Sequence, residues 1–190
     1  ASVYAMKELK DRSDIPVLGV VDAGVRASLK NSTEAVGIIG TYGTIKSGSY
    51  EKKIRAANRK IKLISRACPL FVPLVEEGWL NNDITRAVAH RYLDLFRGKI
   101  DTLILGCTHY PLLIDIISEV VGEKVRVINS AVEIASEVKG KTTELDLQNK
   151  AKKEPCYSFY VSDAPELFKE RSSIFMNGAT GNVERIDLKG

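Results

Sequence analysis

The chain has few cysteines for its length. There are three in 190 residues, Cys68, Cys107 and Cys156. They are odd in number and far apart, which excludes a disulfide framework and a paired-cysteine zinc site. No metal site is therefore expected, and the cysteine usage is typical of a protein of the reducing cytoplasm.

Long apolar runs and a one-sided charge are also missing. The apolar runs are interrupted by glycine, proline or polar residues, so no segment is expected to span a bilayer, and no signal peptide opens the sequence. The 28 Lys and Arg residues balance 24 Asp and Glu residues and are mixed with them along the chain, leaving a net charge of +4 without a basic stripe. We therefore expect a soluble globular protein with neither a nucleic-acid nor a membrane partner.

Short apolar runs alternate with helical patterns along most of the chain. This alternation predicts βαβ units and an α/β fold, with a parallel sheet in a three-layer αβα arrangement. A polar, charged stretch at 139–154 is expected to be a mobile connection. The predicted strands are 15–22, 36–41, 61–67, 102–106, 125–129 and 158–162, and the predicted helices lie near 1–10, 23–30, 47–60, 72–78, 83–97, 112–121, 131–138 and 165–171.

The residues that follow the predicted strands are the first candidates for a site. In open parallel sheets, ligands bind beyond the carboxyl ends of the strands. Small, hydroxyl-bearing and thiol-bearing residues are concentrated there, which indicates a small polar ligand held by backbone amides and helix N-termini. The segments are 22–24, 40–44, 68–69, 106–109 and 129–130.

Cys107 is the sharpest candidate among them. It follows a predicted strand, and Pro111 is placed to begin a helix where its missing N–H costs nothing. Backbone N–H groups and the positive end of that helix would stabilise a thiolate at Cys107, and His109 is close enough to be a charge partner. The alternative is a cysteine that packs as a small hydrophobic side chain. Thr, His and Pro in this order favour the reactive interpretation.

The other candidates are less specific. The turn at 40–44 is rich in glycine and hydroxyls and suits a carboxylate or a phosphate, but ordinary turn chemistry explains it equally well. Glu76 and Glu77 follow an apolar run. One of their carboxylates would stabilise the protonated form of a histidine, or the two would lie at the end of a solvated helix. Cys68 is expected to pack, Cys156 to be incidental, and His90 to lie on an exposed helix face.

Three stretches resemble the glutamate racemases of the aspartate/glutamate racemase superfamily. Leu-Gly-Cys-Thr-His-Tyr-Pro-Leu-Leu at 105–113 resembles the second cysteine signature of these enzymes. Residues 37–50 and 67–78 resemble two further family stretches in the same order and spacing. The likeness runs from residue 1 to about residue 130 and more loosely beyond.

The resemblance implies a reaction and roles for particular residues. Enzymes of this family interconvert L- and D-glutamate without pyridoxal or another cofactor, using two thiols on opposite faces of the α-carbon as acid and base. It implies that Cys107 is one of the two, that Thr108 and His109 bind substrate and assist the thiol, and that Glu76 orients or charges His109. Thr41 and Thr44 would hold a substrate carboxylate. The expected role is to supply D-glutamate for peptidoglycan in the cytoplasm; a homodimer remains open.

The sequence departs from the family pattern in its N-terminal part. The family's Asp-Ser, Tyr-Gly and Cys-Asn-Thr motifs, the last with the first catalytic cysteine, find no match, and neither Cys68 nor Cys156 corresponds to that cysteine. The resemblance therefore implies a parent of two similar α/β domains, with the end of the first at 1–23, the second at 24–130 and a returning segment at 131–190. Such a chain is expected to be inactive alone. The alternatives are a related aspartate- or hydantoin-type racemase and a non-catalytic ligand-binding fragment.

Overall fold

A computed structural model describes residues 5–32, 34–151, 156–176 and 181–187. The chain divides into two compact units, 1–147 and 148–190. The division into 1–23, 24–130 and 131–190 expected from the resemblance remains a prediction.

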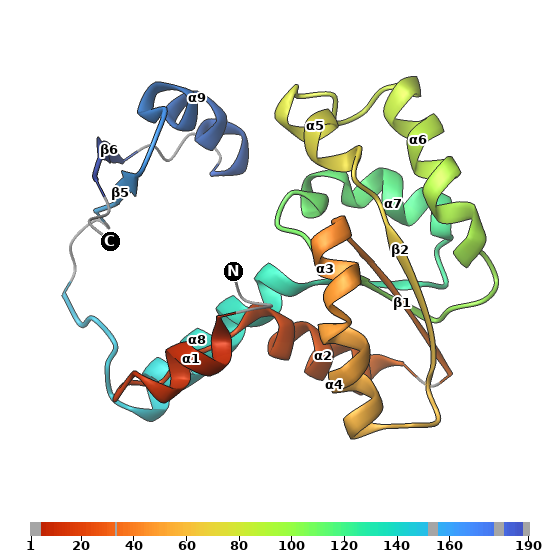
Figure 1. The fold of residues 1–190 in the computed structure, drawn as a ribbon, viewed down its shortest axis with the longest axis horizontal. Helices are drawn as coiled ribbons and strands as arrows, with labels where there is room; N and C mark the ends of the chain where they lie inside the picture. Colours follow the sequence, from red (N-terminus) through yellow and green to blue (C-terminus); the bar gives the residue numbers. More distant parts are fainter. Residues whose placement is uncertain (1–4, 33, 152–155, 177–180, 188–190) are drawn as a thin grey trace. The chain divides into compact units, whose positions relative to one another are not determined.

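The first unit alternates helices and strands from one end to the other (Figure 1). Its elements are α1 (Met6–Asp11), α2 (Val20–Asn31), β1 (Ala35–Gly40), α3 (Tyr42–Ser47), α4 (Ser49–Ala57), β2 (Lys62–Ala67), α5 (Phe71–Glu76), α6 (Asp83–Leu93), η1 (Asp94–Phe96), β3 (Thr102–Leu105), η2 (Tyr110–Leu113), α7 (Ile114–Val121), β4 (Arg126–Asn129) and α8 (Ser130–Glu144).

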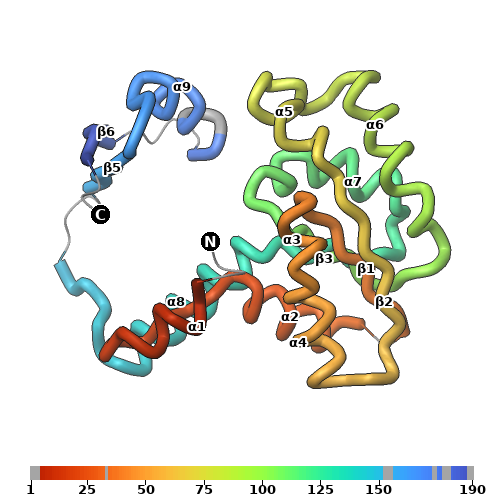
Figure 2. Tube along the Cα trace, in the orientation of Figure 1, coloured from red at the N-terminus to blue at the C-terminus, as the bar shows by residue number. Residues whose placement is uncertain are grey.

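The four strands form one parallel sheet in the order β2-β1-β3-β4. Figure 2 shows β1 running between β2 and β3. Because β1 neighbours both β2 and β3, the chain leaves β1 in one direction and later crosses back to its other side. The sheet therefore has a change of strand order at the carboxyl ends of β1 and β3, where ligands of such folds bind.

Side chains alternate between two cores, one on each face of the sheet. In β1, Val36 and Ile38 point into a core with α2 and α4, whereas Ala35 and Ile39 point into a core with α5, α6 and α7. Figure 1 shows α5, α6 and α7 gathered on one side of the strands. All six residues of β1 are buried, as a strand covered on both faces requires. The predicted α/β fold with a parallel sheet between helices is confirmed.

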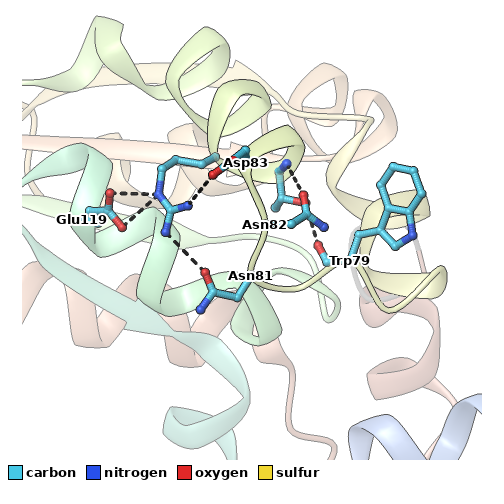
Figure 3. Close-up of polar contacts among 7 residues, drawn as sticks. Trp79, Asn81, Asn82, Asp83 and Glu119 are labelled. Carbon is cyan, nitrogen blue, oxygen red and sulfur yellow. Dashed lines mark hydrogen bonds and ion pairs between the residues drawn. The ribbon is translucent and has the colours of Figure 1, made fainter.

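A polar network fixes the start of α6 against α7. Asn82 caps the helix by accepting from the Thr85 N–H at 2.9 Å, and the Thr85 hydroxyl donates to the Trp79 carbonyl at 2.6 Å. The Arg86 Nε lies 3.1 Å from Glu119 Oε1 of α7 (Figure 3). These contacts join neighbouring helices on the face of the sheet that carries α5.

One predicted strand is wrong. The apolar run at 15–22 contains no strand: residues 16–19 have no regular structure, and α2 begins at Val20. The run mixes an exposed loop, in which Ile15 is 74% exposed, with the first turn of a helix whose buried face includes Val21 and Val25. Val21 and Val25 are four residues apart, which is helical spacing that a continuous apolar run conceals.

The predicted connection at 139–154 is also partly wrong, because α8 continues to Glu144. Lys141 and Glu144 pair at 2.8 Å on one face, an interaction that supports a helix with little apolar surface. Residues 1–4 and 152–155, on which parts of the predicted first helix and of this connection fall, lie outside the described residues.

The second unit contains β5 (Ser158–Val161), α9 (Pro165–Phe175) and β6 (Asn182–Arg185). β5 and β6 pair in parallel, with Phe159 opposite Val183. The sequence predicted β5 and the start of α9 but not β6, whose polar residues carry no strand pattern. Among the residues that the structure describes, no helix is long and apolar enough to cross a membrane, and no group of His, Cys, Asp or Glu side chains could hold a metal ion.

Candidate functional site

A cavity of about 230 Å³ lies at the carboxyl end of the sheet. Its lining comes from elements far apart in the sequence: the start of α2, α3 and α4, the residues after β3, and the β4–α8 junction. Among the lining residues are Thr44, Tyr50, Gly106, Cys107, Thr108 and Ser130. The predicted position of the site, beyond the carboxyl ends of the strands, is where the structure has this cavity.

Cys107 lies in the wall of this cavity and is half-buried. Burial raises the pKa of its thiol above the ordinary value of 9.0, and hydrogen bonds from the backbone N–H groups of His109, Tyr110 and Thr108 oppose that rise. These amides point toward the sulfur because residues 106–109 turn the chain from the end of β3 to the start of η2, which has a proline in its first turn. The donors expected from the sequence are therefore present, but burial outweighs them, and the thiol rather than the thiolate is favoured at neutral pH.

Thr41 and Thr44 form a hydroxyl pair after β1. Thr41 caps α3 by accepting from the Thr44 N–H at 3.3 Å, and the two hydroxyl oxygens are 3.1 Å apart. Thr44 lines the cavity, whereas Thr41 does not. Of the two residues predicted to hold a carboxylate, one reaches the cavity, and the other holds it in place.

His109 and Glu76 form a pair across two elements, as the sequence suggested. The His109 Nε2 lies 3.3 Å from Glu76 Oε1, and both side chains are partly exposed. The other ring nitrogen, Nδ1, is 3.5 Å from the Thr108 hydroxyl. The pair does not belong to the cavity lining, so it reaches the site through Thr108, which does.

Two residues of the cavity that sequence reasoning did not single out as chemistry-bearing are Tyr50 and Ser130. Tyr50 is 2% exposed and lies in the first turn of α4, whereas the residues predicted for the site follow strand ends. Ser130 was noted only as a residue after β4. Its hydroxyl donates to the Leu105 carbonyl at 3.3 Å.

The remaining cysteines differ from Cys107 in their surroundings. Cys68 is fully buried in the core that includes Phe71, and burial raises its pKa to about 12. Cys156 is exposed and belongs to the second unit. The prediction that Cys68 packs is confirmed.

The cavity can accept or deliver a proton at one point of a small polar ligand. Cys107 supplies a titratable thiol, and the Thr44 and Thr108 hydroxyls supply donors and acceptors beside it. A positively charged group on the ligand near Cys107 would favour the thiolate by lowering the thiol pKa. The lining therefore suits a small polar ligand that carries a positive charge near Cys107 and oxygen atoms within reach of the two hydroxyls.

Comparison with known proteins gives one consistent result. The sequence matches the Asp/Glu/hydantoin racemase family over residues 1–138. The glutamate racemase of Geobacter metallireducens is 40% identical over all of this chain, which covers 71% of that protein. The glutamate racemase of Streptococcus agalactiae is also 40% identical, with 99% of this chain and 72% of that protein covered.

Solved structures agree with the sequence comparison. A glutamate racemase isoform from Bacillus anthracis has a TM-score of 0.90 at 32% identity, covering 98% of this chain and 70% of that one. The glutamate racemase of Francisella tularensis, solved in complex with D-glutamate, has a TM-score of 0.86 at 31% identity, covering 99% of this chain and 69% of that one.

Proposed function

Because the chain belongs to the Asp/Glu/hydantoin racemase family, as one of its glutamate racemases, we propose that Cys107 is the acid/base residue for one face of the glutamate α-carbon. The thiol would remove the α-proton of one enantiomer and deliver a proton when the other enantiomer reacts. The observation that carries this proposal is that, of the two cysteines of the first unit, Cys107 lines the cavity at the carboxyl end of the sheet, whereas Cys68 is buried in a core.

The cavity offers partners for the rest of the substrate. We propose that Thr44 and Thr108, which line the cavity, bind a glutamate carboxylate. The Thr41 hydroxyl, 3.1 Å from that of Thr44, would hold the Thr44 side chain in place. Hydroxyls and backbone amides are suited to this role because they stabilise negative charge that develops during proton removal. The substrate ammonium group would offset the burial that raises the pKa of Cys107.

His109 and Glu76 are proposed to act at the edge of the site. Glu76 lies at hydrogen-bonding distance from one ring nitrogen of His109, and Thr108 lies near the other. A histidine held between two partners has a fixed ring orientation. We propose that the pair orients Thr108 and assists the thiol as a proton donor or acceptor, in agreement with the role that the family resemblance implies.

The reaction needs a second base on the opposite face of the α-carbon. Cys68 cannot serve, because it is buried in a core and its pKa is raised to about 12. The family resemblance assigns the second base to the cysteine of a Cys-Asn-Thr motif, and this motif does not occur in the 190 residues. We propose that the two thiols act without a cofactor, and that the D-glutamate formed enters peptidoglycan synthesis in the cytoplasm.

Glutamate is expected to protect Cys107 from alkylation. With iodoacetamide, Cys156 should react first because it is exposed, Cys107 more slowly, and Cys68 hardly at all in the folded protein. The Cys107 rate should keep rising with pH through 9, because its pKa is raised above that value and the thiolate is the reactive form. Saturating glutamate should slow Cys107 and leave Cys156 unchanged, as measured by mass spectrometry of peptides.

Two controls sharpen this experiment. Glutamine at the same concentration lacks the second carboxylate and should protect less, and Thr44→Val should weaken the protection by glutamate. Equal labelling of Cys107 with and without glutamate would rule out the cavity as the glutamate site.

A further inference from the structure

Tyr110 is a fully buried tyrosine whose hydroxyl reaches the end of a second strand. The side chain is 0% exposed and belongs to the core on the face of the sheet that carries α5. Its hydroxyl donates to the backbone carbonyl of Cys68 at 2.8 Å, which satisfies a phenol that would otherwise be costly to bury. Cys68 directly follows β2, whereas Tyr110 lies beyond β3. The bond therefore joins the segments that leave two different strands.

The Cys68 carbonyl is also where helix α5 begins. It accepts from the N–H of Phe71, the first residue of α5, at 3.2 Å, so one oxygen receives both this N–H and the Tyr110 hydroxyl. A carbonyl oxygen has two lone pairs and can accept both. The rings of Phe71 and Tyr110 meet edge to face, with centroids 5.2 Å apart. Tyr110 is thus fixed to the start of α5 by its hydroxyl and by its ring.

The backbone of Tyr110 closes the turn that carries Cys107. The Tyr110 N–H donates to the Cys107 carbonyl at 3.3 Å, so Thr108 and His109 lie within one hydrogen-bonded turn. The N–H that closes the turn and the hydroxyl that reaches Cys68 belong to the same residue. The position of the turn relative to α5 therefore depends on Tyr110.

A second contact joins the same two segments. Glu76 is the last residue of α5, and its carboxylate oxygen Oε1 lies 3.3 Å from the His109 Nε2. This contact is open to water, since the two side chains are 25% and 32% exposed, whereas the bond between Tyr110 and Cys68 is buried. A hydrogen bond is electrostatically stronger in the protein interior than in water. The buried bond is therefore the firmer of the two, and it sets the separation at which His109 meets Glu76.

We propose that Tyr110 is a positioning residue, whose hydroxyl, through the Cys68 carbonyl, fixes the turn of Cys107 against α5. The inference rests on the proposed role of Cys107. Tyr110 does not line the cavity, so it acts on the ligand only through the turn. Without the hydroxyl, the ring stays in the core, but the turn loses its buried link to α5. The Cys107 thiol and the Thr108 hydroxyl are then presented to the ligand less precisely, and His109 moves relative to Glu76.

The test uses Tyr110→Phe, which keeps the ring and removes only the hydroxyl, in the 190-residue protein. Cys107 alkylation by iodoacetamide is followed as a function of pH, with and without glutamate. We expect the apparent dissociation constant for glutamate, measured from the protection of Cys107, to rise roughly threefold to tenfold, the loss expected from one hydrogen bond. The midpoint of the Cys107 pH profile should also rise, because the backbone amides of a loosened turn stabilise the thiolate less well.

Glu76→Gln, alone and combined with Tyr110→Phe, separates positioning from a general loss of stability. If Tyr110 sets the separation of His109 and Glu76, that pair is already displaced in Tyr110→Phe. Glu76→Gln should then weaken glutamate binding by a smaller factor in the Tyr110→Phe background than in the unaltered protein. Equal factors in the two backgrounds would show that the Tyr110 hydroxyl does not position the pair.

Tyr92→Phe is the matched control. Tyr92 lies in the same core, 9% exposed, and its ring meets Phe71 edge to face at 5.4 Å. Its hydroxyl accepts from the Leu70 N–H at 3.4 Å, so it also contacts the segment before α5, but Tyr92 belongs to α6 and not to the turn of Cys107. The control should change thermal stability without moving the Cys107 profile or the glutamate constant.

Each variant is assayed at a temperature at which circular dichroism shows it to be folded. An unchanged Cys107 profile and glutamate constant in Tyr110→Phe, or equal shifts in Tyr92→Phe, would overturn the inference. Failure of glutamate to protect Cys107 in the unaltered protein would instead overturn the proposed function.

Discussion

Replacing Cys107 with alanine is expected to abolish racemisation in a form of the protein that also carries the cysteine of the Cys-Asn-Thr motif. One face of the α-carbon would then have no thiol to remove or deliver a proton. A positioned acid/base group contributes roughly 10²- to 10⁴-fold to a rate, and every racemisation event requires both faces. Circular dichroism of each glutamate enantiomer, followed to equilibrium, measures the loss.

The control for this variant is Cys156→Ala, because it also removes a thiol but at an exposed position of the second unit. We expect it to racemise at the unaltered rate. In deuterated water, Cys107→Ala should still exchange the α-proton of one enantiomer, since the opposite thiol remains. Racemisation that survives in Cys107→Ala would show that Cys107 is not an acid/base residue.

The 190-residue protein itself is expected not to racemise glutamate. Cys107 is the thiol in the cavity wall, Cys68 is buried in a core, and no Cys-Asn-Thr motif occurs in the sequence. A single thiol can remove a proton and return one to the same face, but inversion needs a proton from the other face. The expected rate of inversion is that of the buffer alone, measured by circular dichroism with protein purified from a host that lacks its own glutamate racemase.

The variants Cys156→Ala and Cys68→Ala test whether either of these cysteines could act as the second base. If the unaltered 190-residue protein did turn over, loss of activity in one of these variants would identify the second base. Turnover that persisted in both would contradict the two-thiol account.

The fold could be predicted largely from the sequence because its strands are short and the two central ones, β1 and β3, are apolar and buried. β1 and β3 are buried throughout, so their apolar runs correspond to strands. The run at 15–22 failed because a loop and a helix start can be as apolar as a strand. The extension of α8 to Glu144 was missed because this part of the helix has polar residues and an ion pair between Lys141 and Glu144 instead of an apolar pattern.

The candidate site was predictable in part, for a similar reason. Cys107, Thr44 and Thr108 follow strands, and strand ends of a parallel sheet converge. Tyr50 was missed because it lies within a helix, and its place beside Gly24 and Gly106 depends on packing between distant segments. The direction of the Cys107 pKa shift could not be predicted from the sequence. The local sequence predicts the amide donors that lower the pKa, but the burial that outweighs them comes from the tertiary structure.

The most direct test of the central claim is α-proton exchange by the 190-residue protein in deuterated water. Proton NMR follows the α-proton of pure L- and pure D-glutamate, with Cys107→Ala as the control. We expect one enantiomer to lose its α-proton signal while keeping its configuration, and this exchange to disappear in Cys107→Ala. Exchange of both enantiomers or of neither, inversion, or exchange that persists in Cys107→Ala would contradict the role of Cys107 as the acid/base residue for one face.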